Sequence, residues 1–199
     1  MKGLRGWVAG MAALFAACRT PVEPEPIAGP VPSSIAVWPF VLGAPGADGN
    51  LVLSGLAPAV VARGYRVIAP GVTEQLLLDR GLDAGGPVVP AKDAIAADAV
   101  LQVVVREFTA RGKAPLQEAR WDLQWRLVVP GSGAVAWQWS HRGGWRHDPG
   151  DVGDPHRALD AEPELVPIGG RGRPPFRDVQ ELLANLHRSA MDHLPRCSR

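Results

Sequence analysis

The chain has 199 residues, of which 46% are hydrophobic and 21% are charged, a composition typical of one globular domain with appendages and not of a disordered chain. Its formal net charge of +1 provides no basic field that would attract nucleic acid. Prolines and glycines cluster in Pro21–Pro32, Gly81–Pro90 and Gly143–Pro175. This clustering predicts a tether, a loop and a long irregular excursion around a compact core.

The first seventeen residues have the three parts of an export signal. Lys2 and Arg5 make a positively charged start, and an apolar stretch, Trp7–Ala17, follows them. This stretch is far shorter than the ~20 residues that a membrane-spanning helix needs. We therefore expect residues 1–17 to be a signal peptide that is removed.

The end of this segment, Phe15-Ala16-Ala17-Cys18, resembles the lipobox of bacterial lipoproteins. The resemblance implies cleavage after Ala17 and acylation of Cys18, which then anchors the mature chain to a membrane. An ordinary signal peptide with an incidental cysteine is the alternative. The two cases differ at Cys197, because a lipidated Cys18 cannot form a disulfide with it and an unmodified one can.

Residues 18–33 are expected to form a tether between the anchor and the folded domain. Prolines at positions 21, 24, 26, 30 and 32 exclude a helix and favour the extended polyproline conformation. At about 3.1 Å per residue, such a segment holds the domain some tens of ångströms from the lipid.

Strand and helix patterns alternate along residues 34–195, which predicts a single α/β domain. Strands are expected at Ser33–Phe40, Tyr65–Pro70 and Ala99–Phe108, the last of them apolar on both faces as in a buried central strand. Helices are expected at Leu51–Gly64, Val72–Leu82 and Pro90–Asp98. Thr73 is a candidate N-cap of the second helix, and Gly81 is its terminator.

Two segments with strict alternation predict an antiparallel hairpin. In Trp121–Val129 and Ala134–Arg142 the apolar residues fall at alternate positions, and Gly131-Ser132-Gly133 lies between the two segments. The register that joins them pairs Val129 with Val135, Leu127 with Trp137, Trp125 with Trp139, and Asp122 with Arg142. Because the tryptophans share the apolar face with His141, we expect them to pack in the core and not to form a platform for carbohydrate.

A last helix within Phe176–Leu194 has apolar residues at helical spacing and is expected to dock on the sheet. The order β-α-β-α-α-β-β-β-α then predicts a mixed sheet, parallel in its first half and with the antiparallel tryptophan-rich hairpin at one side. Beyond Pro195 the chain is expected to fray, which argues against a functional pair of Cys197 and His193.

Several stretches resemble a family of bacterial lipoproteins of unknown function that includes surface-antigen candidates of Neisseria. They are SSIAVWPF, VVARGYRVIAPGVTEQLLLDRGL, IAADAVLQVVVREF, WRLVVPGSGAVAWQWS and LHRSAMDHLP; residues 143–175 match nothing in the family. The family is similar to the α/β domain of the curli secretion lipoprotein CsgG and to the amino-terminal domain of TolB. This kinship implies a non-enzymatic role in envelope assembly or secretion, without catalytic residues or cofactors.

Donors for a metal ion gather in one segment, residues 141–156. The donors are His141, His147, Asp148, Asp151, Asp154 and His156. Their spacing matches neither the H-E-x-x-H zinc helix nor the alternating acids of an EF-hand loop. Asp-Pro and Pro-Gly pairs are also ordinary turn formers. A metal-binding protein or metal-dependent enzyme is therefore the alternative hypothesis.

The favoured hypothesis is a lipid-anchored, non-enzymatic envelope protein of a Gram-negative bacterium that binds other envelope proteins. Arg19 follows the cysteine, where an aspartate would resemble an inner-membrane retention signal, so we expect the outer membrane, facing the periplasm. Trp145, Arg171 and Arg173 are candidate partner contacts in the excursion. A third hypothesis is a small-ligand site at the carboxyl ends of the parallel strands, where the sequence offers no convergent polar group.

Overall fold

The computed structural model describes residues 26–43, 48–83, 85–112, 116, 118–146 and 176–197, with only the backbone described at 145 and 146. The strands are β1 (Ser34–Val37), β2 (Leu42–Gly43), β3 (Arg66–Ile68), β4 (Ala99–Arg111), β5 (Glu118–Val128) and β6 (Val135–Arg146). The helices are α1 (Gly49–Leu53), α2 (Leu56–Val61), α3 (Pro70–Leu78), the 3₁₀ helix η1 (Val89–Asp93) and α4 (Val179–Asp192). Within these ranges, none of the helices is long and apolar enough to cross a membrane.

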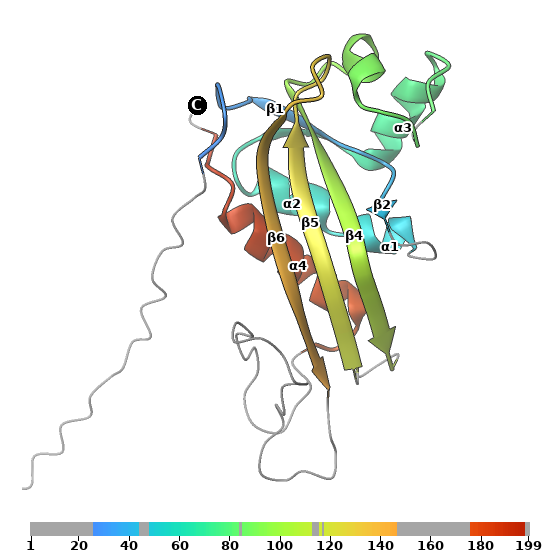
Figure 1. The fold of residues 1–199 in the computed structure, drawn as a ribbon, viewed down its shortest axis with the longest axis vertical. Helices are drawn as coiled ribbons and strands as arrows, with labels where there is room; N and C mark the ends of the chain where they lie inside the picture. Colours follow the sequence, from blue (N-terminus) through green and yellow to red (C-terminus); the bar gives the residue numbers. More distant parts are fainter. Residues whose placement is uncertain are drawn as a thin grey trace, which may run out of the picture.

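One mixed sheet organises the molecule (Figure 1). Its strands follow the order β3-β1-β4-β5-β6, and β2 pairs separately with β4. β1 runs parallel to both β3 and β4, whereas β5 runs antiparallel to both of its neighbours, β4 and β6. The predicted α/β domain with a mixed sheet is thus confirmed.

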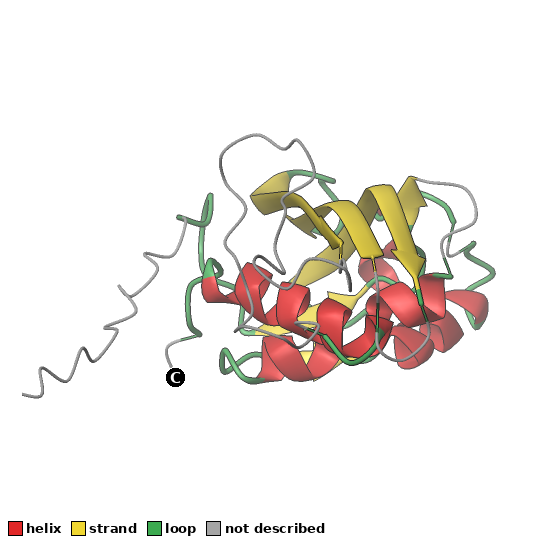
Figure 2. Cartoon of the chain, turned by 90° about the horizontal axis from the view of Figure 1, so that it is seen from below, coloured by secondary structure: helices red, strands yellow, loops and turns green. Residues whose placement is uncertain are grey.

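Two apolar cores cover the two faces of the sheet. The larger core lies between α1, α2, α4 and what we call the inner face, and it contains Leu101, Leu123 and Leu183. The smaller core lies under α3 and η1 on the outer face, around Trp38 and Leu77. Figure 2 shows most of the helices on one side of the long strands. Val128 of β5 also belongs to the smaller core, and beyond it the outer face of β5 and β6 carries mainly polar side chains.

The prediction of one continuous helix over Leu51–Gly64 is wrong, because two short helices, α1 and α2, occupy this region. Gly55 has the left-handed φ of +81° and separates α1 from α2. A Cβ on Gly55 would lie 3.5 Å from the side chain of Ala184 on α4, an ordinary van der Waals distance, so the left-handed φ is what favours glycine at this break. Pro58 then sits in the first turn of α2, where its missing N–H costs no helical hydrogen bond.

Two other helix predictions need correction. Thr73 is not an N-cap: α3 begins at Pro70, and the buried Thr73 hydroxyl donates to the carbonyl of Ala69 at 3.1 Å. A proline in the first position suits a helix start because its φ is already helical. The helix expected over Pro90–Asp98 is instead the short 3₁₀ helix η1.

The predicted hairpin register is confirmed over most of its length. Trp125 pairs with Trp139, Leu127 with Trp137, and Asp122 with Arg142. It is wrong at the turn, where Val135 pairs with Val128 because the ladder shifts after Leu127. The ion pair of the Asp122 carboxylate is with Arg106 on β4, at 3.9 Å.

The two ends of the domain are held against it. The N–H of Ala28 donates to the carbonyl of Ala136 on β6 at 2.7 Å, so the final third of the predicted tether lies on the sheet. At the other end, the Tyr65 hydroxyl donates to the Pro195 carbonyl at 2.6 Å, and the Cys197 N–H donates to the Arg63 carbonyl at 3.1 Å. The expectation of a frayed tail is therefore wrong as far as Cys197.

Candidate functional site

Aromatic and histidine rings fill the space between the hairpin and α4. Trp125 and Trp137 are buried, and Trp139 is half-buried. The prediction that these tryptophans pack in the core is confirmed, because their strand positions alternate with polar ones as the inner face requires. The cluster holds three of the chain's five histidines, which are His141, His187 and His193.

His187 is the buried anchor of this cluster. Its Nδ1 accepts a hydrogen bond from the Trp125 indole at 3.1 Å, and its Nε2–H donates to the carbonyl of Val52 at 2.7 Å. Both ring nitrogens are therefore used by a neutral imidazole. Burial lowers the pKa of His187 to about 4, and the bond to Val52 opposes this shift in part. Such a ring fixes α4 to the sheet and α1 and has no free nitrogen for catalysis.

His141 belongs to a stack of rings. The Trp121 indole donates to its Nδ1 at 2.9 Å, and its ring lies parallel to that of Trp139, with centroids 5.4 Å apart. His193 stacks on Trp139 at 4.5 Å. Among the residues that the structure describes, no group of three or more His, Cys, Asp and Glu could hold a metal ion. The other donors of the metal hypothesis, at positions 147–156, lie outside the described residues.

Within the described residues, the outer edge of β6 is open along most of its length. β6 pairs with β5 on one side, and Ala136 receives the bond from Ala28 on the other. Backbone groups of alternate residues point to the same side of a strand, so those of Gln138, Ser140 and Arg142 also point outward. No residue in the described part of the chain pairs with them, and all three side chains are exposed.

A hollow of about 420 Å³ lies at the start of this edge. It is lined by Pro26 of the tether and by Val135–Gln138 of β6. The Trp137 indole N–H is buried there without a partner among the described residues. The docked tether and the hollow thus occupy one end of the edge, and no described residue pairs with its backbone at Gln138, Ser140 and Arg142.

Arginines outnumber carboxylates on the outer face of β4, β5 and β6. Strand alternation and register place on this face Arg106, Arg111, Arg120, Arg126, Arg142, Glu107, Glu118 and Asp122. Ion pairs at 3.7–3.9 Å join Arg106 to Asp122, and Arg111 and Arg120 to Glu118. The face next to the open edge is therefore positively charged overall.

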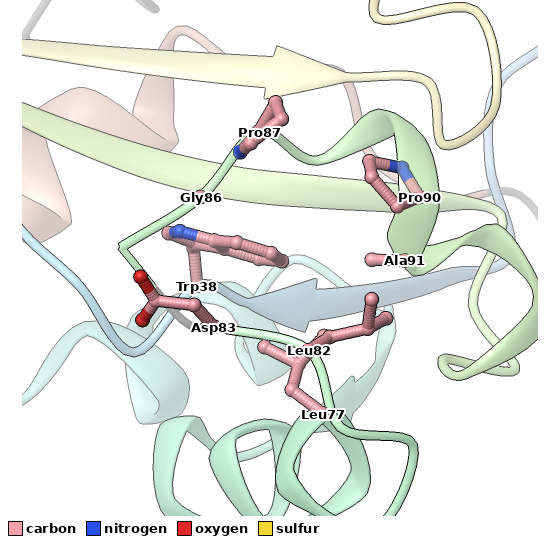
Figure 3. A pocket seen from close by; sticks show the side chains of 8 residues that line it. All are labelled: Trp38, Leu77, Leu82, Asp83, Gly86, Pro87, Pro90 and Ala91. Carbon is pink, nitrogen blue, oxygen red and sulfur yellow. The ribbon is translucent and has the colours of Figure 1, made fainter.

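A second feature is a pocket on the outer face, at the carboxyl end of β1. Trp38 follows the last residue of β1, and its side chain is fully buried. The pocket has a volume of about 140 Å³, and Leu77, Leu82, Asp83, Gly86, Pro87, Pro90 and Ala91 complete its walls. The Trp38 indole nitrogen has no hydrogen-bond partner among the described residues. In Figure 3 this nitrogen lies on the side of Asp83 and Gly86.

Trp38 places one polar group, its buried indole N–H, at this edge of the sheet. In the sequence, the position of this tryptophan directly after a strand and directly before Pro39 was the feature that could have indicated a polar group here. Periodicity could not reveal that its N–H lacks a partner, because that depends on the α3–η1 connection folding over it.

The predicted site residues cannot be placed by their side chains. Cys18, Arg171 and Arg173 lie outside the described residues, and Trp145 contributes only its backbone, near the end of β6. Their roles in lipidation and partner contact remain predictions.

Comparisons with known proteins give structural likenesses only. No protein-family model and no curated protein matches the chain. Among solved structures, it is similar to lipoprotein GNA1162 from Neisseria meningitidis, with 25% identity, a TM-score of 0.46, and coverage of 58% of this chain and 84% of that one. It is also similar to the PelC dodecamer from Paraburkholderia phytofirmans, with 14% identity, a TM-score of 0.45 and coverage of 83% and 89%. The LpoB C-terminal domain from Salmonella enterica has 14% identity, a TM-score of 0.43 and coverage of 58% and 86%. Structural neighbours thus include bacterial lipoproteins, while the kinship with CsgG and TolB remains a prediction.

Proposed function

We propose that this protein is a lipid-anchored component of the bacterial envelope, at the outer membrane and facing the periplasm, that binds other envelope proteins and catalyses no reaction. The lipobox-like sequence before Cys18 supports the anchor. The open outer edge of β6 is the observation that carries the binding role.

An open edge strand is a surface that can form hydrogen bonds with another chain. Folded proteins usually shield such edges with short strands, prolines or covering loops. β6 is 12 residues long, and its outward backbone groups at Gln138, Ser140 and Arg142 form a row with which none of the described residues pairs. An extended segment of a partner would add to this row as a further strand, with backbone hydrogen bonds supplying affinity.

The positive charge of the adjoining outer face indicates which side chains a partner strand would carry. The excess of arginines beside the edge favours a strand with acidic side chains at alternate positions, because one of those side chains would face Arg142 across the new pair and Arg126 lies on the same face one strand further, on β5. β6 ends at Arg146. Trp145, and Arg171 and Arg173 outside the described residues, would extend the contact.

Site-specific photo-cross-linking in living cells tests this role. A photoreactive residue at Gln138 should give discrete adducts with envelope proteins, and one at the exposed Arg188 on α4 should not. Ser140→Pro removes an outward N–H and is tolerated at an edge strand, so it should abolish the adducts without lowering the melting temperature. Equal adducts from both positions, or adducts unchanged by Ser140→Pro in a folded protein, would refute the edge as the binding surface.

A further inference from the structure

Two neighbouring rows of side chains form what we call the Arg126 patch, on the outer face of the three long strands. From β4 to β6, the first row is Gln102, Arg126 and Gln138, and the second is Val104, Gln124 and Ser140. We propose that this patch binds a sugar acid, such as a hexuronate, whose carboxylate pairs with Arg126 and whose hydroxyls bond to the glutamines. The proposal does not rest on strand pairing at the β6 edge, because Gln102 and Arg126 lie on β4 and β5.

Arg126 carries a positive charge that no described residue compensates. Other arginines of this face are in ion pairs, as Arg106 is with Asp122. Within the described residues, no hydrogen bond or ion pair reaches the Arg126 side chain. Of its three nitrogens, Nε is the one that is buried without a partner. The two terminal nitrogens keep accessible surface, so a carboxylate can bind them through two parallel hydrogen bonds.

The glutamines of the patch are also without partners in the described part of the chain. Gln102, directly opposite Arg126, is only 8% exposed, and no described residue forms a hydrogen bond with its amide. A polar group that is buried without a hydrogen bond costs free energy, and a ligand would supply the missing bond. Each amide has two N–H donors and an acceptor oxygen. This combination matches sugar hydroxyls, because a hydroxyl both donates and accepts.

The dimensions of the patch suit one sugar ring. Neighbouring strands lie about 4.8 Å apart and alternate residues of one strand about 6.8 Å apart, so the two rows cover an area of about 10 by 7 Å. A six-membered ring fits on this area with its carboxylate at Arg126 and its hydroxyls over the amides. Val104 is 9% exposed and supplies an apolar contact for the C–H groups of the ring.

The charges around the patch favour an anionic ligand. Neither row contains a carboxylate. Asp122 is the nearest acid along the outer face of β5, four residues or about 14 Å from Arg126, and its charge is already paired with Arg106. A neutral sugar would leave Arg126 uncompensated, and a carboxylate without hydroxyls would leave the amides unused. The patch therefore selects a ligand that carries both groups.

NMR titration of the mature full-length protein in detergent micelles tests binding at the patch. The probe is the methyl glycoside of glucuronate, observed at the Nε–H signal of Arg126 in ¹⁵N-labelled protein, which Arg126→Lys identifies by removing it. We expect a saturable shift of this signal and of the Gln102 amide. Methyl glucoside, which lacks the carboxylate, and cyclohexanecarboxylate, which lacks the hydroxyls, should bind roughly tenfold more weakly or worse.

Four variants separate the patch from the general charge of the face, with binding followed at the remaining glutamine amides. Arg126→Gln removes the charge and should weaken binding tenfold or more. Arg126→Lys keeps the charge but loses the pair of parallel donors, so it should weaken binding several-fold. Gln102→Leu removes the buried amide at similar volume and should also weaken binding several-fold. Arg106→Gln, on the same face outside the patch, is the matched control and should leave binding unchanged.

Several results would overturn the proposal. One is the absence of a saturable shift with the glucuronate probe, and another is equally tight binding of methyl glucoside or cyclohexanecarboxylate. Equal weakening by Arg126→Gln and Arg106→Gln would mean that the overall charge of the face attracts the ligand. Undiminished binding in Gln102→Leu, with a melting curve showing that the variant is folded, would contradict the role of the glutamines.

Discussion

His187 makes the stability of the domain depend on pH in a defined window. Its pKa falls from 6.5 to about 4 on folding, so between these values the unfolded chain binds the proton more tightly than the native one. The contribution of His187 to the free energy of unfolding is therefore fully present above about pH 6.5, declines as the pH falls, and levels off below about pH 4. The full loss is on the order of 3 kcal/mol, and urea unfolding at a series of pH values measures it.

A single substitution isolates this effect from the other histidines. In His187→Gln the amide can accept from Trp125 and donate to Val52, but it does not titrate. The variant should be less stable at pH 7 by about 1–3 kcal/mol and should lose most of the slope between pH 6.5 and 4. A slope equal to that of the wild type would mean that other groups cause the pH dependence.

At the level of elements, one carboxylate ties the start of β1 to the start of β4. Oδ2 of Asp98 accepts hydrogen bonds from the N–H and the hydroxyl of Ser33, at 2.8 and 2.7 Å, and from the same two groups of Ser34, both at 3.0 Å. These bonds, above all the one from the Ser33 hydroxyl, lower the pKa of Asp98 to about 2. The stabilisation is present above about pH 4 and is lost as the pH falls through about 2.

Asp98→Asn tests this link between the strands. Because the residue is exposed, its loss should cost only about 1 kcal/mol at pH 7, and the remaining stability should change less between pH 4 and 2. Asp93→Asn, at an exposed carboxylate five residues earlier, is the matched control and should change neither quantity. The measurement is urea unfolding by circular dichroism. If the two variants behave alike, the Asp98 bonds do not stabilise the strand pair.

Some elements of the fold could be predicted from the sequence, and others could not. Strict alternation and the pairing of Asp122 with Arg142 were enough to predict the hairpin register, because a one-residue slip would have exposed every tryptophan. The shift beside Val128 and the break at Gly55 were not predictable from apolar spacing. Val128 packs into the smaller core under α3 and η1, and Gly55 lies against Ala184 of α4. The burial of His187 likewise depends on Trp125 and Val52, which lie 62 and 135 residues away.

At the scale of the whole molecule, the tether is shorter than its proline content implied. Ala28 is bound to β6, and Ile27 packs against the larger core. Only the residues before Pro26 are then available as a stalk, so a lipid on Cys18 would hold the sheet within about 25 Å of the membrane at about 3.1 Å per residue. The open edge of β6 would lie close to that surface, where other anchored proteins are concentrated.

Cys18 is the residue on which this arrangement depends, and the intact mass of the mature protein from a membrane fraction tests it. A chain that begins at Cys18 and carries a diacylglyceryl or triacyl group is expected, and Cys18→Ser should lose both the added mass and the membrane association. Cys197 is a free, half-buried thiol in the structure, so the lipidated protein should take up one iodoacetamide per chain after unfolding. A chain without lipid, cut elsewhere and unable to react with iodoacetamide until reduced, would instead indicate a disulfide between Cys18 and Cys197. That disulfide would remove the anchor, and with it the reason to place the β6 edge at a membrane.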